Sequence, residues 1–250
     1  MFLKVLPTPG HVADVAADLV GRVLDAAPRV RLGVATGATP LPLYHELVRR
    51  HRSGRVELPE LDLFLIDEYL GLAPDDPRAF RNVIVEHLAR PLGLGDHAVH
   101  APDVGASDLD GACRAFDQAR ERDGLALQVL GIGGNGHVAF NEPGSPFDSR
   151  CRVVTLTERT RLDNGLGPGD PTRAVTVGID SLLRPERLLL VATGARKAEA
   201  LAAALAGPDP SSPASAMLAH PDLTIVADEA AAALLPPDLR AGALAEEAPA

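Results

Sequence analysis

Two adjacent carboxylates, Asp67 and Glu68, follow the apolar run 61–66 and are the first candidates for chemistry. Adjacent side chains point in different directions, so these two are not expected to act as a matched pair, and one of them should face a crevice. A carboxylate held against the end of an apolar strand can have a raised pKa and serve as a general base. A helix cap or a surface turn explains the same residues equally well, so the spacing leaves both interpretations open.

His137 is the second candidate, and it follows a glycine-rich turn at the end of the apolar run 125–132. The glycines allow a tight backbone that passes close to a neighbouring group. Glu142, five residues after the histidine, could orient the imidazole and tune its proton affinity. A lone histidine is more often structural, but its position in such a turn among polar neighbours favours a functional role.

Two further segments suit an anion, and each connects a predicted strand to a predicted helix. The first comprises Thr36, Gly37, Ala38 and Thr39. Its hydroxyls, small residues and helix-start N–H groups suit a phosphate, although it is not a P-loop and ordinary turn chemistry is the alternative. The second contains Lys197, which opposes the helix dipole unless an anion binds there. A solvated surface lysine is the alternative interpretation.

The elements that must position these residues alternate between strand-like and helix-like runs. Helices are predicted over 11–27, 40–50, 83–89, 107–123 and 197–205, and strands over 31–35, 61–66, 125–132, 150–155, 174–178, 188–193 and 223–227. This order predicts an α/β fold with three layers, in which an open, mostly parallel, Rossmann-like sheet carries helices on both faces. Ligands of such sheets bind at the carboxyl ends of the strands, where the candidate residues lie.

The 250 residues suit a single α/β domain over 1–235, followed by a tail, 236–250, that is rich in Ala, Pro and Glu and expected to be flexible. No apolar run approaches the roughly 20 residues of a membrane span, and the N-terminal residues do not resemble a signal peptide. We therefore expect a cytoplasmic protein that does not bind membranes and whose two cysteines, Cys113 and Cys151, are buried and reduced.

The net charge of −10, without a basic stripe, argues against nucleic acid as a partner. It does not exclude an anionic small substrate, because a pocket can be locally positive inside an acidic protein. The eight histidines include no HxH or HExxH arrangement, so no metal site is predicted. Ser145 and Ser149 lack the nucleophile elbow of a serine hydrolase.

In combination, these motifs resemble the glucosamine-6-phosphate deaminase family, whose fold relatives are the 6-phosphogluconolactonases. The likeness extends from about residue 8 to residue 230 and rests on residues 35–40, 67–69, 136–144 and 174–178 and on Lys197. Asn141-Glu142-Pro143 distinguishes the deaminases from the lactonases. Several separate motifs in the same order make a chance match a poor explanation.

The resemblance implies an isomerising deamination in amino-sugar catabolism, in which glucosamine 6-phosphate and water give fructose 6-phosphate and ammonia. His137 would open the sugar ring, assisted by Glu142 and Asn135. Asp67 would then move a proton between C2 and C1 through an enolamine. The resemblance implies a sugar phosphate as the binding partner and no metal or organic cofactor.

The same resemblance assigns residues 36–39 and Lys197 to the substrate phosphate, but one family feature is missing on this side. Members usually carry an arginine that helps bind the phosphate, and Leu166 stands at its position. Without the bidentate contact between arginine and phosphate, another cation should bind the phosphate. Arg161 and Arg173 are the candidates in the sequence.

Three alternatives remain open from the sequence, and the oligomeric state is not determined by it. A paralogue with the same proton-transfer residues could act on a different sugar, as Leu166 suggests. A non-catalytic sugar-phosphate sensor is permitted by the fold, and a lactonase is the hydrolytic alternative. Val154 replaces a lysine used by allosteric members, so activation by an amino-sugar phosphate is not expected.

Overall fold

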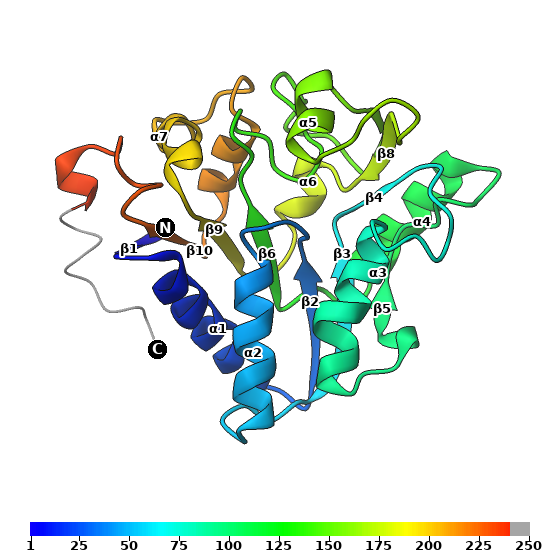
Figure 1. Ribbon diagram of the computed structural model, residues 1–250, viewed down its shortest axis with the longest axis horizontal. Helices are drawn as coiled ribbons and strands as arrows, with labels where there is room; N and C mark the ends of the chain where they lie inside the picture. Colours follow the sequence, from blue (N-terminus) through cyan, green and yellow to red (C-terminus); the bar gives the residue numbers. More distant parts are fainter. Residues whose placement is uncertain (241–250) are drawn as a thin grey trace.

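A sheet of seven parallel strands, in the order β1-β10-β9-β6-β2-β3-β5, forms the centre of the computed structural model, which describes residues 1–240 (Figure 1). The strands span Phe2–Leu6 (β1), Arg29–Val34 (β2), Glu60–Leu65 (β3), Val99–His100 (β5), Leu127–Gly131 (β6), Leu188–Ala192 (β9) and Leu223–Asp228 (β10). All neighbouring strands in this sheet run parallel. The predicted parallel sheet is therefore confirmed, with β1 and β5 added at its two edges.

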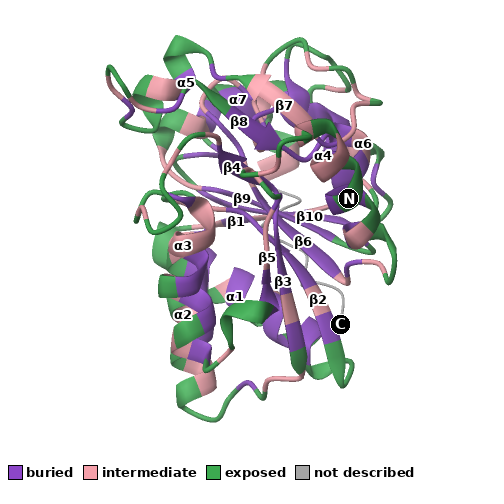
Figure 2. Ribbon diagram, turned by 90° about the vertical axis from the view of Figure 1, so that its right-hand side faces the viewer, coloured by how far each residue is buried: buried purple, intermediate pink, exposed green. Residues whose placement is uncertain are grey.

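Helices cover both faces of this sheet (Figures 1 and 2). They span Pro9–Asp25 (α1), Leu41–Arg52 (α2), Phe80–Ile84 (α3), Leu109–Glu121 (α4), Glu158–Asp163 (α5), Ile179–Leu182 (α6) and Ala198–Leu205 (α7). A π-helical turn, Val85–Ala89, follows α3 directly. The helices predicted over 11–27, 40–50, 83–89, 107–123 and 197–205 are thus present, with small shifts at their ends.

Successive side chains of β9 point to opposite faces of the central sheet, and both faces are buried. Leu188 and Leu190 pack into the core shared with α4, α6 and α7, whereas Leu189 and Val191 pack into the core shared with α1 and α2. Burial on both faces explains why this strand is a continuous apolar run in the sequence.

Two predicted strands belong to a second, antiparallel sheet rather than to the central one. β7 (Arg152–Thr155) and β8 (Arg173–Thr176) pair with each other, and β8 pairs with β4 (Asp67–Tyr69). An apolar run indicates a strand but not its partner, so the sequence did not separate the two sheets. The pairing places Asp67 opposite Thr176 and so holds β4 beside the end of the central sheet.

Residues 237–240 form a helical turn, in which the Arg240 N–H donates to the Pro236 carbonyl (3.1 Å). Most of the tail predicted over 236–250 lies outside the described residues. Cys113 and Cys151 are buried and free. Within residues 1–240, no helix is both long enough and apolar enough to cross a membrane.

Candidate active site

A cavity of about 760 Å³ opens beyond the carboxyl ends of the central strands. Its walls come from the segments after β2, β3, β6 and β9 and from α5. The predicted site residues that line it are Thr36, Gly37, Ala38, Thr39, Asp67, His137 and Lys197. Asn135 and Glu142 do not line the cavity and instead lie next to His137.

Asp67 is the first residue of β4, and its side chain borders this cavity although it is only 7% exposed. Burial raises the pKa of the Asp67 carboxyl well above its ordinary value, and the nearby charge of Glu68 raises it further. A raised pKa brings a carboxyl group closer to the working pH, which makes its ionised form a stronger base. Asp67 therefore has both the position and the proton affinity of a general base.

Glu68 has a different, structural role. Its carboxylate accepts hydrogen bonds from the backbone N–H groups of Tyr69 (2.8 Å), Phe80 (3.0 Å) and Arg81 (2.8 Å). The last two residues begin α3, so Glu68 satisfies N–H groups that a helix start leaves without partners. Burial raises the pKa of Glu68, while the three backbone donors lower it. The helix-cap interpretation thus applies to Glu68, and the cavity-facing one to Asp67.

Two glycines allow His137 to occupy the cavity wall. A Cβ atom on Gly133 would lie 2.3–2.4 Å from three atoms of the imidazole, so only glycine fits beneath this ring. Gly136 adopts φ 85°, and a Cβ there would lie 2.9 Å from Ser212 Oγ. Burial lowers the pKa of His137 and Lys197 lowers it further, although Glu142 opposes this, so the imidazole is neutral at pH 7.

Glu142 forms the centre of a hydrogen-bonded group beside the histidine. Its Oε2 lies 4.0 Å from His137 Nδ1 and accepts a hydrogen bond from Asn135 Nδ2 (2.8 Å). Asn135 Oδ1 accepts the backbone N–H of His137 (3.2 Å). The hydroxyls of Thr157 and Thr160 donate to Glu142 Oε1. This arrangement fixes Glu142 next to the imidazole but not in hydrogen-bond contact with it, because Nδ1 has no hydrogen-bond partner among the described residues.

Gly133→Ala should lower kcat/KM roughly 10- to 100-fold, because the new methyl group must displace the imidazole from its position. Steady-state kinetics and a thermal melt of the same preparation measure the effect on activity and on folding. Gly105→Ala is the control, since a Cβ at Gly105 lies 3.5 Å from its nearest neighbour and this residue does not line the cavity. Equal losses in the two variants would contradict the assigned role of Gly133.

The loop after β2 presents the start of α2 to the cavity. The Tyr44 hydroxyl anchors this loop, since it donates to the Ala35 carbonyl (2.7 Å) and accepts the Ala35 N–H (3.1 Å). Thr36 and Thr39 are half-buried, and no side chain caps the start of α2. Pro40 and Pro42 carry no N–H, so the donors that this loop can offer an anion are the backbone N–H groups of residues 37–39, which line the cavity.

Lys197 stands at the cavity wall just before α7, half-buried. Burial lowers its pKa, and the adjacent charge of Arg196 lowers it further. An anion bound beside the ammonium group would raise this pKa again and offset both effects. Lys197 and the loop after β2 thus border the same cavity.

Neither cation that the sequence suggested as a substitute for the missing arginine lies in this cavity. Leu166 is 5% exposed and packs into a small apolar cluster with Tyr69 and Phe140. Arg161 donates to the Gly167 carbonyl (2.7 Å), and neither Arg161 nor Arg173 lines the cavity. Arg159, which belongs to no recognisable sequence motif, does line it.

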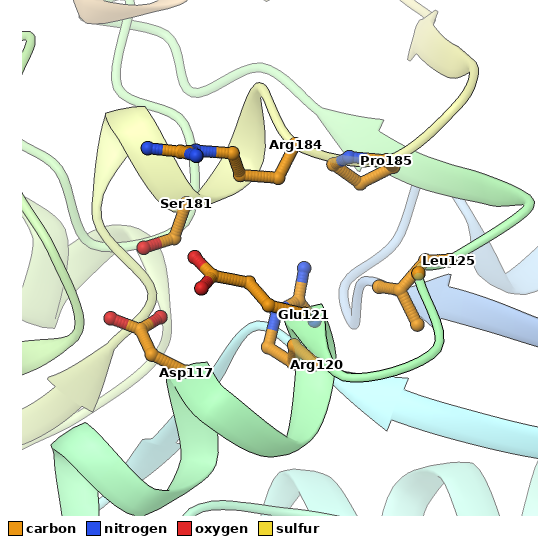
Figure 3. A pocket seen from close by; sticks show the side chains of 8 residues that line it. Asp117, Arg120, Glu121, Leu125, Ser181, Arg184 and Pro185 are labelled. Atoms are coloured by element: carbon orange, nitrogen blue, oxygen red, sulfur yellow. The ribbon is translucent and has the colours of Figure 1, made fainter.

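A second cavity of about 210 Å³, between α4 and α6, contains none of the predicted site residues (Figure 3). Arg120 lines it and also donates to the Leu65 carbonyl (3.2 Å) and to Gln128 Oε1 (2.7 Å). Burial lowers the pKa of Arg120 to about 10, so the side chain remains charged at neutral pH. Because Leu65 and Gln128 belong to β3 and β6, Arg120 ties together the strands that lead to Asp67 and His137.

Comparisons with known proteins agree with this geometry. The family model described as glucosamine-6-phosphate isomerases/6-phosphogluconolactonase matches residues 8–226. The chain belongs to this family. Within it, the glucosamine-6-phosphate deaminase of Streptomyces avermitilis is 42% identical over 242 residues, covering 94% of this chain and 93% of that protein. The Cutibacterium acnes deaminase is 44% identical over 230 residues, covering 90% and 88%.

Solved structures of family members give the same result. A monomeric glucosamine-6-phosphate deaminase superposes with a TM-score of 0.90 at 34% identity, covering 94% of this chain and 100% of that chain. The 6-phosphogluconolactonase of Trypanosoma cruzi superposes with a TM-score of 0.74 at 20% identity, covering 93% and 96%. The lactonase comparison shows a shared fold only. The resemblance inferred from the motifs is confirmed.

Proposed function

We propose that this protein converts glucosamine 6-phosphate and water into fructose 6-phosphate and ammonia. The observation that carries the proposal is that Asp67 and His137 face one cavity whose walls also contain Lys197 and the loop 36–39 before α2. The deaminases of Streptomyces avermitilis and Cutibacterium acnes support the choice of substrate.

His137 opens the sugar ring in the first step. A neutral imidazole can accept the proton of the C1 hydroxyl and deliver a proton to the ring oxygen, which breaks the bond between C1 and that oxygen. Asn135 holds the His137 backbone N–H, and the nearby charge of Glu142 stabilises the imidazolium that forms during the transfer. The product of this step is the open-chain amino aldehyde.

Asp67 carries out the second step on the open chain. Its carboxylate removes the proton from C2 while the carbonyl oxygen at C1 takes up a proton from solvent, which gives an enolamine. A proton is then delivered to C1 and the nitrogen-bearing carbon becomes the imine at C2. Water adds to this imine, the bond between C2 and nitrogen breaks, and ammonia leaves. Oxidation at C2 balances reduction at C1 within the sugar, so no external redox partner is required.

The phosphate lies at the opposite side of the cavity in this proposal, held by residues 36–39 and Lys197. The backbone N–H groups and threonine hydroxyls of this loop and the Lys197 ammonium supply donors for its oxygens. We also propose that the protein acts in amino-sugar catabolism and in the cytoplasm. A reducing compartment is consistent with the two free, buried cysteines.

Purified protein with glucosamine 6-phosphate should release ammonia and fructose 6-phosphate in equal amounts. Separate enzymatic assays of the two products measure this ratio. Hydrolysis of 6-phosphogluconolactone in place of this reaction would contradict the proposal and support the lactonase alternative. Binding of the sugar phosphate without turnover would contradict it and support a sensor.

A related amino-sugar or sugar-phosphate substrate is the second candidate function, because Leu166 changes the phosphate side of the cavity. A panel of phosphorylated and unphosphorylated hexoses and hexosamines separates the two candidates by their kcat/KM values. A clear preference for glucosamine 6-phosphate would exclude the second candidate.

A further inference from the structure

The short helix α5 presents one arginine to the active-site cavity. Arg159 lines this cavity together with Lys197, whereas Leu166, nearby in the sequence, is buried in an apolar cluster. The Arg159 Nη2 atom lies 4.0 Å from the place where a Cβ on Gly134 would stand. The backbone oxygen of Arg196 lies 3.4 Å from the same point. Arg159 therefore reaches the turn before His137, next to the segment that carries Lys197.

The guanidinium of Arg159 is held by one carboxylate and keeps free donors. Its Nε donates to Asp163 Oδ2 (3.0 Å), one helical turn away on α5. Residues 1–240 provide no hydrogen-bond partner for its Nη1 or Nη2 atoms. A planar guanidinium oriented through Nε can offer two N–H groups at once to a tetrahedral anion.

Asp163 contributes to the same part of the cavity. It lines the cavity and lies close enough to Lys197 and His137 for its charge to raise the pKa of both groups. Without a ligand, this carboxylate partly balances the charges of Arg159 and Lys197. A bound phosphate would accept from the two Nη groups while Asp163 retains Nε, so Asp163 acts as a positioning residue for Arg159.

From this geometry we propose that Arg159 binds the substrate phosphate together with Lys197 and replaces the arginine that is missing at Leu166. The inference rests on the proposed function, since it concerns the phosphate of the same substrate. Arg196 also lines the cavity, but no described side chain orients its guanidinium, so it lacks the preorganisation that Arg159 has. α5 and the residues after it lack the family's arginine at Leu166, but they carry Arg159 in its place.

The test compares Arg159→Met, Arg159→Lys and Arg196→Met with a control, Arg173→Met, whose side chain is exposed and does not line the cavity. Steady-state kinetics with glucosamine 6-phosphate give kcat and KM. Calorimetry measures binding of glucitol 6-phosphate, an open-chain sugar phosphate without a carbonyl group, and of unphosphorylated glucitol as the reference.

Arg159→Met should raise KM about 10- to 100-fold and weaken glucitol 6-phosphate binding by a similar factor, with kcat changed less than about threefold. Arg159→Lys should recover part of the affinity, because an ammonium replaces the charge but not the two-pronged contact. The control should match the wild type. Unchanged affinity in Arg159→Met, or a loss confined to Arg196→Met, would overturn the inference.

Failure of the proposed function gives a different result. If the wild type does not turn over glucosamine 6-phosphate but binds glucitol 6-phosphate in a manner that depends on Arg159, the reaction is wrong and the phosphate site stands. If turnover is normal and the affinity does not depend on Arg159, the reaction stands and the phosphate site is wrong.

Discussion

Replacing Asp67 by Asn lowers kcat with glucosamine 6-phosphate by roughly 100- to 10,000-fold, the usual range for loss of a general base. The amide has nearly the same shape as the carboxyl group but cannot accept the C2 proton. Affinity for glucitol 6-phosphate should change little, because the phosphate contacts lie elsewhere in the cavity. A variant that retains more than about a tenth of the wild-type kcat would show that another group takes this proton.

The same substitution should raise thermal stability at pH 7, which separates loss of the base from misfolding. The raised pKa of Asp67 means that the native state keeps a proton at pH values where the unfolded chain has released it. The free energy of unfolding therefore falls as pH rises from the ordinary aspartate pKa, about 3.9, through the raised native value. Asn at position 67 does not titrate, so Asp67→Asn should have a higher Tm than the wild type at pH 7. This difference in Tm should disappear near pH 3, where Asp67 is protonated in both the folded and the unfolded state.

Replacing His137 by Gln should lower kcat/KM about 100-fold or more, since the amide cannot carry a proton between the C1 hydroxyl and the ring oxygen. The pH profile gives an independent check. His137 must be neutral to accept a proton, and burial places its pKa below the usual 6.5, so the wild type loses activity as pH falls through that lowered pKa. In His137→Gln, the remaining loss of activity at low pH should come from protonation of Asp67 alone.

Glu142→Gln is the matched variant, because Glu142 acts through the histidine and does not line the cavity. Its charge raises the pKa of His137, so its removal should move the histidine contribution to lower pH and reduce kcat by only about tenfold. A wild-type pH profile in this variant would contradict the role given to Glu142.

The central sheet and its helices could be predicted because their apolar periodicity is set by burial on one or two faces. β9 is a continuous apolar run, and α1 has apolar residues three and four apart, so both patterns are visible in the sequence. α5 was missed because its six residues contain one strongly apolar position that is exposed, Leu162. β4 was missed because its strand character depends on pairing with β8.

The candidate site could be predicted where a residue lies shortly after a central strand, as Asp67 does after β3 and His137 does after β6 and its glycine-rich turn. The sequence also correctly separated two carboxylates that point in different directions. It did not find Thr157 and Thr160, which reach Glu142 from 15 and 18 residues away through the fold of α5. Arg159 was missed for the same reason, because the direction of its side chain depends on a helix that the pattern does not reveal.

The transfer of the C2 proton by Asp67 can be followed directly with glucosamine 6-phosphate that carries deuterium at C2. The wild type should remove this deuterium, to C1 of the product or to water, at the rate of turnover and with a primary kinetic isotope effect. Asp67→Asn should leave the label in place while still binding glucitol 6-phosphate. Loss of the label from C2 at the wild-type rate in Asp67→Asn would contradict the assignment of Asp67 as the base.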